Sequence, residues 1–141
     1  MYWSDDIKTA YENMKHKADI IFTGRLEPTN LSKVVGSSIA LVYASVFEGF
    51  GIPIIEAFNA EVPVITSNVT AMPEVAAGAA LLVNPESVEQ IAAAMRKISN
   101  NSKFATSLVE KGKLRRKDFT WDKTAQNIWK SIERINFNND K

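Results

Sequence analysis

Short strand-like runs that are apolar on both faces alternate with helical patterns along this chain. Ile39 to Ala44, Pro63 to Ser67 and Ala80 to Asn84 each have the length of a strand and carry no charged residue. A strand without a polar face belongs inside a parallel sheet that helices cover on both sides. The alternation therefore predicts an α/β fold, a partial Rossmann-like parallel sheet flanked by helices and joined by right-handed crossovers.

The remaining elements complete this pattern. We expect a further strand over 19–23, where an apolar run stops at a glycine. The expected helices are at about residues 4–17, 28–35, 53–60, 71–77, 88–99, 102–117 and 121–135. Trp121 and Trp129 are interpreted as packing residues of the last helix. Residues 1–135 are assigned to one domain and 136–141 to a polar tail.

Charge and composition exclude several classes of function. The chain has 17 basic and 16 acidic residues, a net charge of +1, which gives no electrostatic reason to expect nucleic acid as a partner. It has no cysteine, which excludes disulfides and thiolate metal sites. No apolar run approaches the ~20 residues of a membrane span. We expect a cytoplasmic location; peripheral attachment of a longer parent protein to a membrane stays open.

A glycine-bearing loop follows the Ile39–Ala44 strand and leads into a helix. Ligands of parallel sheets bind at the carboxyl ends of the strands, which is where this loop lies. The N–H groups of Phe50, Gly51 and Ile52 stand at a helix N-terminus and favour an anion such as a diphosphate. Glu48 and Glu56 flank the turn and can accept hydrogen bonds from hydroxyl groups. Together these groups suit a nucleotide sugar, although the same pattern also describes an ordinary solvated strand–helix corner.

The sequence from Phe47 to Ala57 resembles the E-x7-E signature of retaining GT-B glycosyltransferases, the glycosyltransferase group 1 / family 4 type. Segments on both sides agree in order and spacing. They are Ile21–Gly24, Ala44–Ser45, Pro63–Ser67, Met72–Val75, Ala80–Pro85 and Phe119–Trp121. The resemblance covers about residues 19 to 135. It identifies the chain with the C-terminal, donor-binding domain of that family.

The resemblance assigns roles to individual residues. Glu48 matches the glutamate that contacts the donor sugar, and it is the one residue we expect to be catalytic. Glu56 matches the glutamate that binds the ribose hydroxyls. Backbone amides of 49–52 are expected to meet the sugar and the diphosphate, while the segment after Gly24 lines the base pocket. The expected donor-binding residues are Glu48, Gly49, Phe50, Gly51, Ile52, Glu56, Arg25 and Leu26.

Three positions depart from the family pattern or imitate it. Gly24-Arg25 looks like the glycine-arginine motif that holds the diphosphate together with a lysine. Only about 24 residues separate Gly24 from Glu48, room for one helix and one strand, so Arg25 and Lys33 are not assigned that role. The family often has glycine at the position of Glu61, where a left-handed turn would cost a glutamate about 1 kcal/mol.

The resemblance also implies an activity, partners and a missing part. It implies retaining transfer of a hexosyl group from a nucleotide sugar to a glycan or lipid acceptor, with no metal and no cofactor. The family domain begins with two further strand–helix units that we do not find here. The acceptor domain and the basic pair that holds the diphosphate are also expected to lie outside this chain, so we expect it to be inactive alone. Unpaired strand edges are then expected to invite self-association, or the 19–23 strand to shift onto the 39–44 strand. The alternative is a non-catalytic nucleotide- or sugar-binding module.

Overall fold

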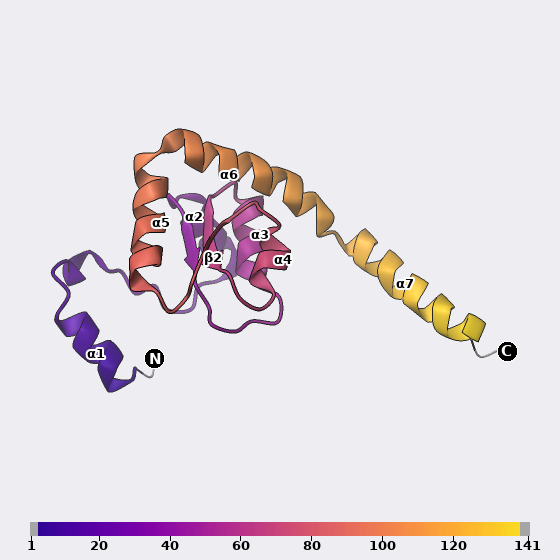
Figure 1. Cartoon of the computed structure of the whole chain (residues 1–141), viewed down its shortest axis with the longest axis horizontal. Helices are drawn as coiled ribbons and strands as arrows, with labels where there is room; N and C mark the ends of the chain where they lie inside the picture. The colour runs from indigo at the N-terminus through magenta and orange to yellow at the C-terminus, as the bar shows by residue number, and fades with distance from the viewer. Residues whose placement is uncertain (1–2, 139–141) are drawn as a thin grey trace.

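The computed structural model describes the backbone of residues 3–138 and the side chains of residues 3–135. Helices and short strands alternate along it, and the two terminal helices extend from a central body (Figure 1). The helices are α1 (Asp5–Glu12), α2 (Pro28–Gly36), α3 (Ile52–Asn59), α4 (Met72–Ala76), α5 (Val88–Asn100), α6 (Ser102–Arg115) and α7 (Trp121–Asn138), with 3-10 turns η1 (Lys17–Asp19) and η2 (Arg116–Asp118). The strands are β1 (Leu41–Tyr43), β2 (Val64–Ser67) and β3 (Leu81–Val83).

The three strands form one parallel sheet in the order β1-β2-β3. Ile65 of the central strand β2 is in register with Val42 on one side and Leu81 on the other. All four residues of β2 are buried, as expected for a strand that has no polar face. The predicted α/β fold, with its parallel sheet flanked by helices, is confirmed.

Alternate residues of β2 point into two apolar clusters on opposite faces of the sheet. Val64 packs with Ile54 of α3 and Met72 of α4. Ile65 packs with Ile98 of α5 on the other face. α6 contacts both α3 and α5, so it closes the body over the two layers (Figure 1). Each of these fully buried side chains stabilises the fold by about 1.5–3 kcal/mol.

The strand expected over 19–23 does not form. Residues 20–24 have no regular secondary structure, and Ile21 is 84% exposed. The ring of Phe22 instead packs against Trp3 and Tyr11, with ring centroids 5.4 and 5.7 Å away. Within residues 3–138 this segment pairs with no strand, and the outer edge of β1 stays open. The expectation that this segment shifts onto the strand at 39–44 is therefore wrong.

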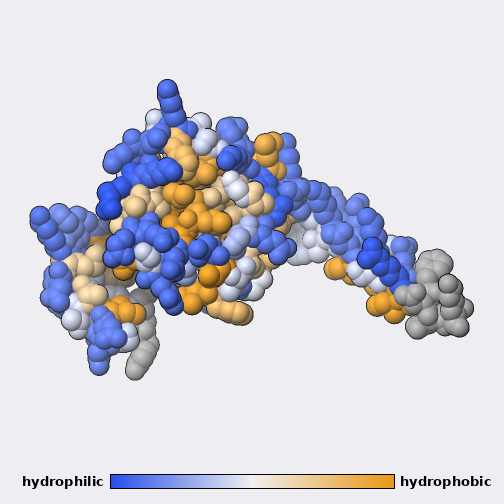
Figure 2. All heavy atoms as spheres, in the orientation of Figure 1, coloured by the Kyte–Doolittle hydropathy of each residue, from blue (hydrophilic) through white to orange (hydrophobic). Residues whose placement is uncertain are grey.

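β1 lies at an edge of the sheet with an apolar hollow beside it. A cavity of about 360 Å³ opens there, and Ile39, Val42 and Met95 are among its lining residues. These three side chains are exposed, and apolar atoms gather on the face that carries β1 (Figure 2). Self-association through this edge stays a prediction, which gel filtration at several concentrations tests directly.

The two terminal helices differ from their expected form. α1 ends at Glu12 rather than at Lys17, and α7 continues beyond Ile135 to Asn138. Residues 139–141 of the expected tail lie outside the described residues. α7 projects from the body with one apolar and one polar side (Figures 1 and 2). Trp121 is 88% and Trp129 61% exposed, so their interpretation as packing residues is wrong for this chain.

The turn after α3 takes the left-handed form at Glu61, whose φ is 59°. Its N–H donates to the carbonyl of Phe58, and the Val62 N–H donates to that of Ala57, which ends the helix in a Schellman motif. The Glu61 carboxylate also pairs with Lys113 at 2.9 Å. The left-handed turn is thus present with a glutamate where the family often has glycine, and an ion pair lies beside it.

No helix among residues 3–138 is both long enough and apolar enough to cross a lipid bilayer.

Candidate functional site

The segment of residues 48–52, called the glycine loop below, lies between β1 and α3 and ends at the first residue of that helix. Gly51 is the N-cap of α3, and its φ of 91° and ψ of 51° are left-handed. A Cβ atom at this position would lie 3.1 Å from Sδ and Cε of the buried Met72. The left-handed backbone angle favours glycine at 51, and the tight contact with the end of the Met72 side chain adds to this preference. Ile52 is the first residue of α3 and Pro53 is the second. A proline fits the first turn of a helix because it has no N–H to leave unpaired.

The glycine loop presents unpaired backbone donors. The N–H groups of Phe50, Gly51 and Ile52 donate no hydrogen bond to another group within residues 3–138. They stand at the N-terminus of α3, where the helix dipole places partial positive charge. Donors and dipole together favour an anion at this turn.

Glu48 is half-buried at the start of the glycine loop and is held in a defined orientation. Its Oε1 accepts a hydrogen bond from the Tyr43 hydroxyl at 2.5 Å and another from Ser45 Oγ at 3.2 Å. The Thr66 hydroxyl donates to the Tyr43 carbonyl at 2.8 Å, which ties the end of β1 to β2. Sequence reasoning missed Tyr43 and Ser45, although a tyrosine and a serine just before the signature glutamate could have suggested them.

The hydrogen bond from Tyr43 to Glu48 makes the stability of the fold depend on pH in the alkaline range. The bond, followed by burial, raises the pKa of Tyr43 above its ordinary value of 10.0. Because the folded pKa lies above the unfolded one, this stabilisation is complete below pH 10 and is lost as pH rises through the folded pKa. We expect the melting temperature of wild type to fall more than that of Tyr43→Phe between about pH 9 and about pH 11.

Thermal melts over that range, with Tyr11→Phe as a second tyrosine variant, test this expectation. Tyr11→Phe should follow wild type, because the Tyr11 ring packs on Trp3 and Phe22. Parallel curves for wild type and Tyr43→Phe would contradict the bond.

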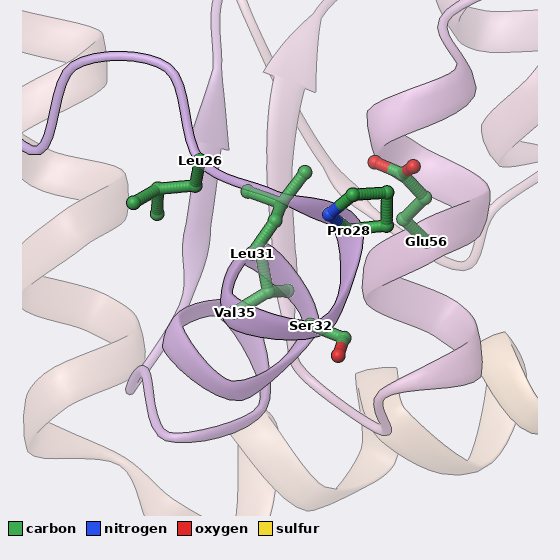
Figure 3. Close-up of a pocket in the computed structure, with 6 residues that line it drawn as sticks. All are labelled: Leu26, Pro28, Leu31, Ser32, Val35 and Glu56. Carbon is green, nitrogen blue, oxygen red and sulfur yellow. The ribbon is translucent and has the colours of Figure 1, made fainter.

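Glu56 lies on α3 at one side of a small pocket. The pocket has a volume of about 170 Å³ and is lined by Leu26, Pro28, Leu31, Ser32, Val35 and Glu56. Figure 3 shows Glu56 projecting from α3 toward Pro28, which begins α2. Apolar side chains thus form most of the wall, and one carboxylate stands at its edge.

The structure brings some of the predicted residues together and leaves others apart. Leu26 and Glu56 share the pocket, whereas Arg25 is exposed and does not line it. Glu48 does not line this pocket either; it lies at the other end of the glycine loop, against Tyr43. Phe50 packs edge-on against Phe119, with ring centroids 5.8 Å apart.

Among residues 3–138, no three acidic or histidine side chains gather closely enough to hold a metal ion.

The glycine loop lies within the part of the chain that matches a known protein family. The sequence profile described as Glycosyl transferases group 1 matches residues 3–115, which include β1, the glycine loop, α3 and the whole sheet. The chain belongs to this group 1 glycosyltransferase family. The predicted family is confirmed, and the α/β body is the part of the chain that carries it.

Two relatives of this group 1 chain are mannosyltransferases of Escherichia coli. O-antigen chain mannosyltransferase B is 32% identical over 128 residues, which are 89% of this chain and 34% of the relative. The serotype-specific mannosyltransferase WbdA is 30% identical over 109 residues, 77% of this chain and 13% of the relative. The chain therefore spans about a third or less of the length of these relatives.

The fold of this group 1 chain resembles part of a larger solved structure. Sucrose-phosphate synthase from Thermosynechococcus elongatus superposes with a TM-score of 0.81 at 23% identity. The superposition covers 92% of this chain and 33% of the synthase. At this identity the likeness concerns the fold, which is of the GT-B type.

Proposed function

We propose that this chain binds the nucleotide-sugar donor for a retaining glycosyltransferase. The observation that carries the proposal is the glycine loop, whose unpaired N–H groups lie between two glutamates with separate surroundings. The loop amides would hold the diphosphate. Glu48 would accept hydrogen bonds from the sugar, and Glu56 would accept them from the ribose hydroxyls.

The pocket beside Glu56 supports this order of groups along the donor. Its apolar wall, to which Leu26 and Leu31 contribute, suits the flat face of a base next to a ribose held by the carboxylate. Arg25 is exposed at the neighbouring position, and its contact with the base stays a prediction.

The transferred sugar is proposed to be a hexose, with mannose as the first candidate. Both relatives described above are mannosyltransferases. The acceptor would be a glycan or a lipid held by a part of the enzyme outside this chain. We therefore expect no transfer by the chain alone, and we propose a reaction without a metal or a cofactor.

The proposed chemistry is a front-face substitution at the anomeric carbon. The bond from that carbon to the diphosphate oxygen breaks, and the acceptor hydroxyl oxygen bonds to the same face. The hydroxyl proton passes to the departing diphosphate. The chain would contribute by stabilising charge on the diphosphate through the loop amides and the α3 dipole. Tyr43 and Ser45 would keep Glu48 oriented toward the sugar while the bond breaks.

Calorimetric titration with nucleoside diphosphates tests the assignment of Glu56. Glu56→Gln should weaken binding about tenfold or more, the cost of a charge-assisted hydrogen bond. The same substitution should change the affinity for a 2′,3′-dideoxynucleoside diphosphate little, because the hydroxyl groups are already gone. An equal loss for both ligands, or for neither, would contradict a ribose contact. Exposed Glu86, replaced by Gln, is the control.

A further inference from the structure

Two elements from outside the family signature support the glycine loop. The side chain of Met72, the first residue of α4, packs against the backbone of Gly51. Phe119, which follows η2, meets the ring of Phe50 edge-on, with an interplanar angle of 84°. The loop is thus supported from two segments that are far from it and from each other in sequence.

Arg115, at the end of α6, contacts both α4 and Phe119. Its Nη2 donates to the carbonyl of Glu74 at 2.8 Å and its Nε donates to that of Val75 at 3.0 Å, near the end of α4. The guanidinium carbon stands 4.6 Å from the centre of the Phe119 ring. A third nitrogen, Nη1, donates to Asp118 at 2.9 Å. One side chain therefore fixes both α4, which packs against Gly51, and the Phe119 ring, which packs against Phe50.

We propose that Arg115 is a positioning residue of the donor site, which sets the conformation of the glycine loop through Phe119 and α4. The inference rests on the proposed function, since the loop amides are the proposed ligands of the diphosphate. Only the planar fork of an arginine can reach two successive carbonyls and a carboxylate while it stacks on an aromatic ring. Lysine keeps the charge and loses this geometry.

The first test uses the ligand-free chain. Amide resonances of Gly49, Gly51 and Ile52 are followed by nitrogen-15 NMR in wild type and in Arg115→Lys. They should shift or broaden in Arg115→Lys and stay in place in Arg116→Lys. Arg116 is the matched control, because the Arg116 side chain meets the carbonyl of Asn59 at the opposite end of α3, at 3.2 Å. Loop resonances that stay in place in Arg115→Lys would overturn the inference, even if that variant melts earlier.

The second test uses donor binding by the same variants. Arg115→Lys should raise the dissociation constant for a nucleoside diphosphate about threefold to tenfold, the effect of losing about one cation–π contact. Phe119→Leu should reproduce this loss, and Phe119→Tyr should retain wild-type affinity because it keeps the aromatic edge. Equal affinities in wild type, Arg115→Lys and Phe119→Leu would overturn the inference.

The two tests separate this inference from the proposed function. Loop resonances that move in Arg115→Lys support the positioning role even where wild type binds no nucleotide. That combination would count against the proposed function alone.

Discussion

Replacing Glu48 with alanine should lower kcat of the complete enzyme about 100-fold or more, the cost of one lost transition-state contact. Glu48 has the features that such a contact requires. It is half-buried, and Tyr43 and Ser45 fix its carboxylate through two hydrogen bonds. A carboxylate held in this way accepts hydrogen bonds from the sugar without first having to be ordered. Initial rates at saturating donor measure the effect.

Two further variants separate a role in the reaction from a role in folding. Glu86→Ala replaces an exposed acid and should leave turnover unchanged. Tyr43→Phe should lie between wild type and Glu48→Ala, because Ser45 would still hold the carboxylate. Near wild-type turnover in Glu48→Ala would count against the catalytic assignment. It would favour a module that binds a nucleotide or a sugar without reacting with it.

Replacing Gly51 with alanine should destabilise the chain by about 2–3 kcal/mol. The left-handed backbone at 51 costs an L residue about 1–2 kcal/mol, and crowding against Met72 adds to this. Such a loss lowers the melting temperature of a chain of this size by about 5–10 °C. The same change would also displace the N–H groups proposed to bind the diphosphate, so nucleotide affinity should fall with stability.

The other glycine of the loop is the matched control. A Cβ atom at Gly49 would meet no atom within 4 Å, and φ there is not in the left-handed range. Gly49→Ala should therefore change stability by no more than about 0.5 kcal/mol. Equal melting temperatures for the two alanine variants would contradict the account of the turn.

Features that depend on local sequence could be predicted, because their cause lies within a few residues. The runs from Ile39, Pro63 and Ala80 had no polar face, and each contains a buried or half-buried strand of the sheet. The glycine loop and the start of α3 followed from glycines and a proline whose backbone preferences are strong.

Features that depend on a distant partner could not be predicted. The apolar run at Ile21 had the length and composition of a strand, but Phe22 packs on the rings of Trp3 and Tyr11, a contact that the run itself does not reveal. The tryptophans of α7 led to the prediction that this helix packs on the body, but the sequence does not show which surface an apolar helix face contacts. In the structure Trp129 is exposed. Arg115 could not be recognised from sequence, because the carbonyl groups it binds lie 40 and 41 residues away.

The most direct test of the donor site is an NMR titration of the 141-residue chain with a nucleoside diphosphate mannose, in guanosine and uridine forms. Our account predicts saturable shifts that are largest at the amides of residues 49–52. A second group of shifts should appear at Leu26 and Glu56, around the pocket beside α3. Saturable shifts confined to the hollow beside β1, or an undisturbed glycine loop at millimolar donor, would contradict it.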